Sequence, residues 1–342
     1  MNLPLFADAA KPAEITSADY IFIVGLLIIG LLATNWIRQT LAAGREPVAF
    51  RPQRLVPWAG WHTIFAALIY LLALTFVAPL IGQVLYLAQG GKGSLFKVAE
   101  DDAAGQLTAA ISVYQGFAVA SFLGFFSINF ELKRRAGATS QDLGIRNDQW
   151  LRDWRLGLIG FVVIVPPVYV LQAILNAVWM KTKHPILTDL KTTDSAALWF
   201  WATTAAVLVA PIVEEFVFRG VIQGWLQRKM AKLPPDCATP NGSHDDDAPK
   251  SLETASAASS LNADAAKLAS AKSIGATPIV LSAALFALVH WEHGPDPIPI
   301  FFLGLGLGYL YRQTHSIWPG VVVHMLMNGG SMLLLALFRD QM

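Results

Sequence analysis

Two adjacent carboxylates and an arginine, Glu214, Glu215 and Arg219, stand in the middle of a long apolar stretch of this chain. Residues 196–210, just before them, carry no charge. Charged side chains are costly inside a bilayer, so they usually mark a functional site there. Glu215 and Arg219 are four residues apart and can pair on one helix face, whereas Glu214 points about 100° away from Glu215. One carboxylate can therefore be held by the arginine while the other faces a cavity and accepts a proton.

Two histidines and an asparagine lie in later apolar segments. His290 follows Phe286 by four residues, and His324 precedes Asn328 by four, so each pair shares a helix face. A lone histidine or asparagine in a membrane helix is commonly a hydrogen-bond partner for another helix. The joint occurrence of these side chains with the two glutamates favours a common site, because ionisable groups are rare in membranes and need partners.

The composition is that of a membrane protein. Of the 342 residues, 54% are hydrophobic and only 14% are charged, against about 25% charged residues in soluble domains. We therefore expect the all-α class: a polytopic membrane helical bundle, in which each helix satisfies its own backbone hydrogen bonds. The net charge of +1 gives no indication of nucleic-acid binding. The single cysteine, Cys237, excludes an intramolecular disulfide.

Eight apolar segments approach the length of about 20 residues that spans a bilayer. They are residues 20–37, 61–87, 107–130, 156–180, 196 onward, 278–291, 298–311 and 317–338. We expect Pro166 and Pro167 to kink the fourth segment, and Pro211 is a candidate break in the fifth. The sixth and seventh segments are short, which suggests partial or tilted helices that line a cavity.

The charges outside these segments suggest an orientation and a domain division. Lysine and arginine gather after the first, third, fifth and seventh segments, which predicts cytoplasmic loops there and both termini outside. The two glutamates should then lie near the cytoplasmic end of their helix, ahead of Arg228. We divide the chain into N-terminal transmembrane helices, residues 1–195, and a transmembrane core, residues 196–342. Residues 231–275 are rich in small and polar residues, and we expect a disordered cytoplasmic insertion there.

Three motifs in the last helices resemble those of the CAAX protease and bacteriocin-processing (CPBP, or Abi) family of intramembrane proteases. They are Glu-Glu-x-x-x-Arg, Phe-x-x-x-His and His-x-x-x-Asn, in this order, and Ser316-Ile-Trp-Pro319 before the third is also similar to the family. The resemblance covers residues 196–330. The insertion of about 45 residues between the first and second motifs is long for this family.

Helix geometry leaves open which carboxylate faces the cavity, and the resemblance implies that it is Glu214, as the general base that activates water. Glu215 and Arg219 would then orient the helix and the base. The other motif residues would position water and stabilise the oxyanion: His290, His324 and Asn328. Two histidines and a glutamate could also bind zinc, but the chain lacks a His-Glu-x-x-His helix. The resemblance implies a metal-free site, so we expect no cofactor and keep zinc as the less favoured alternative.

The resemblance implies an endopeptidase that cuts a membrane-associated or lipidated peptide. The expected partners are this peptide or protein substrate and the lipid bilayer, with no nucleic acid. We expect an integral, multi-pass protein of the plasma (inner) membrane of a bacterium. The alternative is a proton-coupled transporter that uses Glu214 and the histidines as a proton relay. The absence of an inverted repeat or of paired broken helices in the sequence disfavours that alternative.

Overall fold

The computed structural model describes residues 17–51, 55–99, 101–146, 148–179, 186, 189–190, 193–231 and 274–338. Within these ranges the chain forms helices and loops and contains no strand, which confirms the all-α class. The insertion expected at 231–275 lies, except for its ends, outside the described residues, and so does Cys237.

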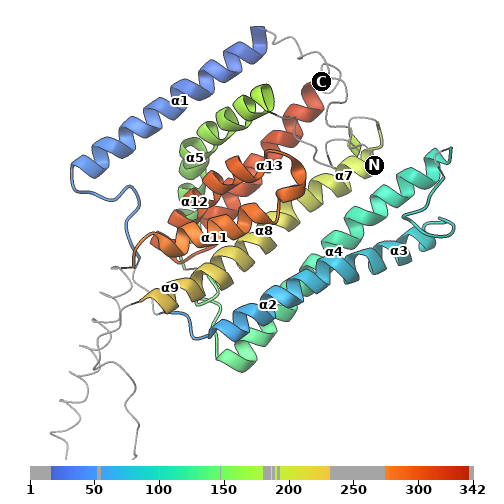
Figure 1. Cartoon of the computed structure of the whole chain (residues 1–342), viewed down its shortest axis with the longest axis horizontal. Helices are drawn as coiled ribbons and strands as arrows, with labels where there is room; N and C mark the ends of the chain where they lie inside the picture. The colour runs from blue at the N-terminus through green and yellow to red at the C-terminus, as the bar shows by residue number, and fades with distance from the viewer. Residues whose placement is uncertain are drawn as a thin grey trace, which may run out of the picture.

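All eight apolar segments are helical (Figure 1). The helices are α1 (Ser17–Ala42), α2 (Gly60–Leu72), η1 (Ala73–Val77), α3 (Ala78–Ala88), α4 (Ala103–Ala136), α5 (Trp150–Val178), α7 (Ala196–Thr203), η2 (Thr204–Val209), α8 (Ala210–Glu215), η3 (Phe216–Gln223), α9 (Gly224–Met230), α11 (Thr277–Leu288), η5 (Trp291–His293), α12 (Pro297–Thr314) and α13 (Trp318–Phe338). Two composite helices are continuous, α2–η1–α3 and α7–η2–α8–η3–α9. By length and composition, six helices of the described chain can cross a membrane. The protein is thus an integral membrane protein.

The fifth segment differs from expectation in two ways. Pro211 does not break it, because the π-helical turns of η2 precede the proline and the helix continues from Ala196 to Met230. The wider turns of a π-helix accommodate a residue that cannot donate an α-helical hydrogen bond. Since the helix is this long, Glu214 lies about midway along it, and the expectation of a position near the cytoplasmic end is wrong. The fourth segment, α5, likewise continues through Pro166 and Pro167.

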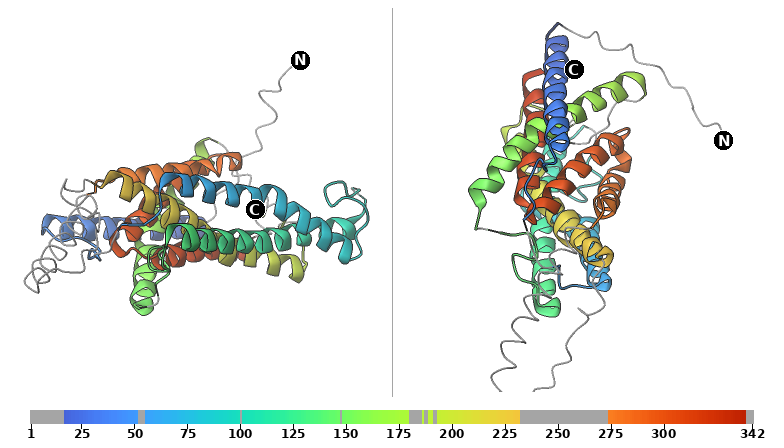
Figure 2. Two further views of the ribbon diagram at one scale, coloured as in Figure 1. Left: turned by 90° about the horizontal axis from the view of Figure 1, so that it is seen from below. Right: turned by 90° about the vertical axis from the view of Figure 1, so that its left-hand side faces the viewer.

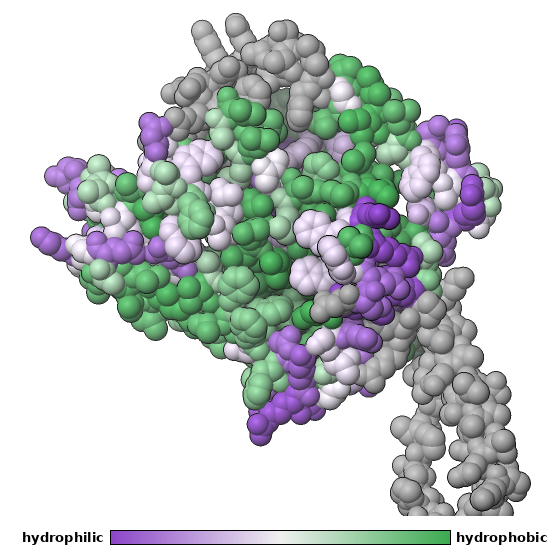
Figure 3. All heavy atoms as spheres, turned by 180° about the vertical axis from the view of Figure 1, so that it is seen from behind, coloured by the Kyte–Doolittle hydropathy of each residue, from purple (hydrophilic) through white to green (hydrophobic). Residues whose placement is uncertain are grey.

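The long helices α1, α2–α3, α4 and α7–α9 run in a common direction (Figure 1), and Figure 2 shows the elongated bundle from two further sides. The closest neighbours are α3 with α4, α11 with α12, and α13 with α5, while α1 packs chiefly on α5. Apolar side chains cover a broad part of the surface, and hydrophilic ones gather toward its edges (Figure 3). This outer surface suits contact with lipid.

Three glycines on α12 permit its close packing in the core, as small residues do in membrane helices. A Cβ on Gly304 would lie 3.0 Å from Ala283 of α11, and one on Gly308 would lie 2.8 Å from Gln223 of η3. On another side, a Cβ on Gly306 would lie 2.8 Å from Ile164 of α5. Substitution of these glycines would therefore push α12 away from three neighbours.

A buried ion pair at one end of the bundle joins the loop before α2 to α5. Arg51, in the loop before α2, lies 3.2 Å from Asp153 of α5, and both side chains are buried. The backbone N–H of Arg51 donates to Gln313 at the end of α12, and Arg228 of α9 donates to the carbonyl of Val56. Basic residues from separate parts of the chain thus lie at one end of the bundle. The distribution of lysine and arginine in the sequence predicts this for segments on the same side of a membrane.

His315 at this end should make stability depend on pH. It is buried between α12 and α13, and burial, with Arg146, Arg51 and Arg312, lowers its pKa to about 4. In the unfolded chain histidine has a pKa of about 6.5. On acidification the unfolded state therefore binds the proton at a higher pH than the folded state. The free energy of unfolding falls between about pH 6.5 and pH 4, by on the order of 3 kcal/mol in total.

His315→Asn should remove this part of the pH dependence. Asparagine is the suitable replacement because it tolerates the left-handed backbone at this position, where φ is 48°. The measurement is the free energy of unfolding in detergent at pH 7.5 and pH 5. An equal loss on acidification in the wild type and the variant would contradict the assignment to His315.

Candidate functional site

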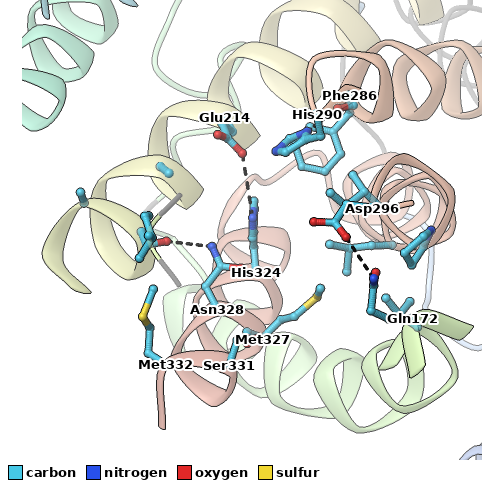
Figure 4. A pocket seen from close by; sticks show the side chains of 18 of the residues that line it. Gln172, Glu214, Phe286, His290, Asp296, His324, Met327, Asn328, Ser331 and Met332 are labelled. Atoms are coloured by element: carbon cyan, nitrogen blue, oxygen red, sulfur yellow. Dashed lines mark hydrogen bonds and ion pairs between the residues drawn. The ribbon is translucent and has the colours of Figure 1, made fainter. Parts of the chain in front are cut away.

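A mostly apolar cavity of about 510 Å³ lies among α4, α5, α8, α12 and α13 (Figure 4). Its polar lining residues are Tyr114, Tyr169, Gln172, Asn176, Glu214, His290, Asp296, His324, Asn328 and Ser331. Four of the six residues expected from the motifs are thus brought to one cavity, although they come from segments far apart in the sequence. The other two, Glu215 and Arg219, lie behind its wall.

The adjacent glutamates point in different directions, as their helical spacing predicts. Glu214 lines the cavity, and its side chain is 14% exposed. Glu215 is fully buried and pairs with Arg219, whose Nε lies 3.2 Å from the Glu215 Oε2 atom. Arg219 also donates to the hydroxyl of Ser282, on α11. The structure therefore separates a carboxylate that can meet a substrate from one that holds α8–η3 against α11.

His324 lies between the two carboxylates. Its Nε2 atom is 3.9 Å from Oε2 of Glu214, and its Nδ1 atom is 3.6 Å from Oε1 of Glu215. Both distances exceed that of a hydrogen bond, so His324 faces both carboxylates without bonding to either. Pro319 occupies the first turn of α13, and His324 follows about one turn later, as the sequence suggests.

Asn328, one turn beyond His324, is held by the opposite helix. Its Nδ2 atom donates a hydrogen bond of 2.8 Å to the backbone carbonyl of Ala206, in η2. An asparagine amide has two N–H groups, so one donor remains after this bond is made. In Figure 4 the side chains of Glu214, His324 and Asn328 line the same side of the cavity.

The spacing of four residues between Phe286 and His290 suggested that both lie on one helix, but the structure places His290 outside a helix. The α11 helix ends at Leu288, and His290 is in the turn before η5. The two side chains nevertheless meet: the Nδ1 atom of His290 is 2.8 Å from the Phe286 carbonyl, and the two rings make an edge contact. The Phe286 ring also contacts His324, and the Arg219 guanidinium lies 4.9 Å from its centre. Phe286 thus separates the arginine from the histidines.

Asp296 is a cavity residue that the sequence reasoning missed, because it lies between the sixth and seventh apolar segments. It precedes α12 at the N-cap position, but its side chain makes no capping hydrogen bond. The first turn offers few donors, since Pro297 and Pro299 have no N–H. The carboxylate instead accepts a hydrogen bond of 3.0 Å from Gln172 of α5 and lines the cavity. An aspartate just before a Pro-x-Pro helix start is the signal that could have identified it.

Gly320→Ala should lower activity through Glu215. A Cβ at Gly320, on α13, would lie only 2.6 Å from Oε2 of Glu215, so either the carboxylate or the helix must move. Overpacking of this kind costs about 1–3 kcal/mol, and a displacement of 1 Å in a catalytic site lowers rates by about a hundredfold. The measurement is the melting temperature together with the rate of the peptide cleavage that the motif resemblance implies.

Gly329→Ala is the control for this substitution. It adds the same methyl group to the same helix, where the nearest atom, in Val207, is 3.6 Å away in ordinary contact. We expect near-normal cleavage by this variant. Equal losses of activity in the two variants would contradict the role given to the close approach at Gly320.

The described residues contain no group of three or more His, Cys, Asp or Glu side chains arranged to hold a metal ion. Among the motif residues, His324 lies 3.6 Å from Glu215 and 3.9 Å from Glu214.

Comparison with known proteins identifies the C-terminal part of the chain. Residues 196–240 and 260–330 match the family model described as "Type II CAAX prenyl endopeptidase Rce1-like". No curated protein and no solved structure matches the chain significantly. The matched residues include the two glutamates, the arginine, both histidines and the asparagine. This region of the chain is therefore similar to the Rce1-like family of CAAX prenyl endopeptidases, which is the CPBP or Abi family.

Proposed function

We propose that this protein is a membrane endopeptidase in which Glu214 activates water to hydrolyse a peptide bond in a membrane-associated or lipidated peptide. One observation carries the choice of base: Glu214 lines the cavity, whereas Glu215 is occupied by Arg219 behind it. The family match favours this peptidase function over the proton-coupled transporter.

The proposed reaction needs one base and several donors. Glu214 takes a proton from water, and the resulting hydroxide attacks the peptide carbonyl to form a tetrahedral oxyanion. His324 and the remaining N–H of Asn328 are the donors that we propose for this oxyanion, and a well-placed donor of this kind contributes about 3 kcal/mol. The Nδ1–H of His290 donates to the Phe286 carbonyl, so His290 would donate to the oxyanion from Nε2 only as the imidazolium. Glu214 then returns the proton to the leaving amine as the C–N bond breaks.

The cavity favours an apolar or lipidated segment next to the cleaved bond. Most of its lining is apolar, and few polar groups converge at Glu214 and His324, which is typical of sites that bind apolar ligands. We propose that the protein resides in the plasma (inner) membrane of a bacterium, with the basic end of the bundle in the cytoplasm.

Quantitative proteomics of membrane proteins in cells with wild-type protein or Glu214→Ala tests this function. We expect a set of membrane-associated peptides to be cleaved only in the wild-type cells, while both proteins insert equally into the membrane. Identical cleavage patterns at equal protein levels would refute the proposal.

Removal of metal tests the zinc alternative. Because the proposed base is a carboxylate and the donors are protein groups, we expect purified protein to retain activity after treatment with EDTA and 1,10-phenanthroline. Elemental analysis of the treated protein measures the remaining zinc. Loss of activity on chelation, with recovery on addition of Zn²⁺, would favour the zinc-dependent mechanism instead.

A further inference from the structure

Pro211, two residues after the π-helical segment η2, leaves a backbone carbonyl without a helical donor. In η2 the N–H of Ala210 donates to the carbonyl of Ala205, five residues earlier. The next residue, Pro211, has no N–H, so it cannot donate to Ala206 in the same pattern. In an α-helix the donor to the Ala206 carbonyl would be the N–H of Ala210, but this N–H already donates to the carbonyl of Ala205. The Ala206 carbonyl is therefore free to accept from elsewhere.

Asn328 supplies the missing donor. Its side-chain amide donates to the Ala206 carbonyl at 2.8 Å, across the contact between η2 and α13. A backbone carbonyl without a helical donor needs another hydrogen-bond partner, and this need is strongest inside a membrane. The bond also fixes the amide of Asn328, because a flip would place its oxygen against the carbonyl oxygen of Ala206.

We propose that Pro211 is a positioning residue for catalysis, which withholds a backbone N–H so that the Ala206 carbonyl orients Asn328 in the cavity. This inference rests on the proposed function. Pro211 is three residues before Glu214 in α8, so a residue in the same turn as the proposed base also controls the partner of Asn328. The π-helical turns and the proline thereby couple the first motif to the third.

The chain contains a matched arrangement away from the cavity. In η1 the N–H of Ala78 donates to the carbonyl of Ala73, and Pro79 follows. This helix, α2–η1–α3, contributes no residue to the cavity lining. Pro79→Ala therefore restores an N–H after a π-helical segment in the same way as Pro211→Ala, but without Asn328 opposite.

The experiment compares Pro211→Ala, Pro79→Ala, Asn328→Ala and the double variant Pro211→Ala/Asn328→Ala in proteoliposomes. The substrate is an internally quenched peptide that ends in a farnesylated CAAX sequence. In Pro211→Ala the new N–H competes for the Ala206 carbonyl, and we expect kcat to fall about ten- to a hundredfold with little change in KM. Pro79→Ala should keep wild-type kcat. The melting temperature of both proline variants should be unchanged or higher, because proline disfavours helix interiors.

The double variant shows whether Pro211 acts through Asn328. If it does, the loss in the double variant equals that of Asn328→Ala alone, since coupled residues are not additive. Four outcomes would each overturn the inference. They are a wild-type kcat in Pro211→Ala, equal losses of kcat in the two proline variants, a melting temperature of Pro211→Ala that falls together with kcat, and additive losses in the double variant. An active wild type with an active Pro211→Ala refutes this inference alone, whereas a wild type that cleaves no peptide in these vesicles or in cells refutes the proposed function with it.

Discussion

Glu214→Gln is expected to lower kcat/KM for peptide cleavage by at least about a thousandfold, since general-base catalysis contributes up to about ten thousandfold. Glutamine keeps the volume and one acceptor oxygen of the side chain, but its amide cannot accept the proton of water at neutral pH. Folding should be unaffected, because Glu214 faces the cavity and is not part of the buried ion pair. The measurement is the steady-state cleavage of the quenched farnesylated peptide.

Glu292→Gln is the control for this loss. Glu292 is an exposed glutamate in η5, close in sequence to His290 but absent from the cavity lining. We expect near-normal cleavage by this variant. A similar loss in both glutamine variants would mean that charge near the site, rather than a base at Glu214, controls the rate.

Arg219→Met should cause the largest loss of stability, about 3–5 kcal/mol, because it leaves the carboxylate of Glu215 buried without its partner. It also removes the donor to Ser282 and the cation over the Phe286 ring. The free energy of unfolding in mixed detergent micelles measures the effect, and cleavage should fall as the site loosens.

Two further variants isolate the buried pair. Arg135 and Glu131 form a pair with the same spacing on α4, but the Arg135 side chain is 59% exposed, so Arg135→Met should cost less than about 1 kcal/mol. Replacing both Glu215 and Arg219 by apolar residues should recover much of the stability lost in Arg219→Met, since a buried pair replaced by apolar groups is often neutral. Equal costs for Arg219→Met and Arg135→Met would contradict the structural role of the buried pair.

The helices could be predicted because their apolar residues form long blocks, but their ends depend on charged and capping residues. The third segment was expected at 107–130, whereas α4 begins at Ala103, where Asp102 accepts a hydrogen bond from Gly105. It continues through basic residues to Ala136, before Gly137 adopts a left-handed conformation. Hydropathy alone does not include these polar turns, so the boundaries were too short.

The site was only partly predictable. Helical spacing gave the Glu215–Arg219 pair and the divergence of Glu214, because both depend on one helix. The π-helical turns around Pro211 could not be predicted, since an apolar pattern does not distinguish hydrogen bonds to the fourth and the fifth preceding residue. Asp296 was missed because its position on the cavity wall depends on Gln172 of another helix.

Chemical rescue of Glu214→Gly tests most directly whether the Glu214 carboxylate is the base. Glycine leaves room for a small carboxylate in the cavity, so added formate should restore a large part of the cleavage that the variant loses. Glu215→Gly should not be rescued, because Glu215 is fully buried beside Arg219 and its loss disrupts the ion pair. Recovery by formate in Glu214→Gly alone is the predicted result, and undiminished cleavage by Glu214→Gly without formate would contradict the account.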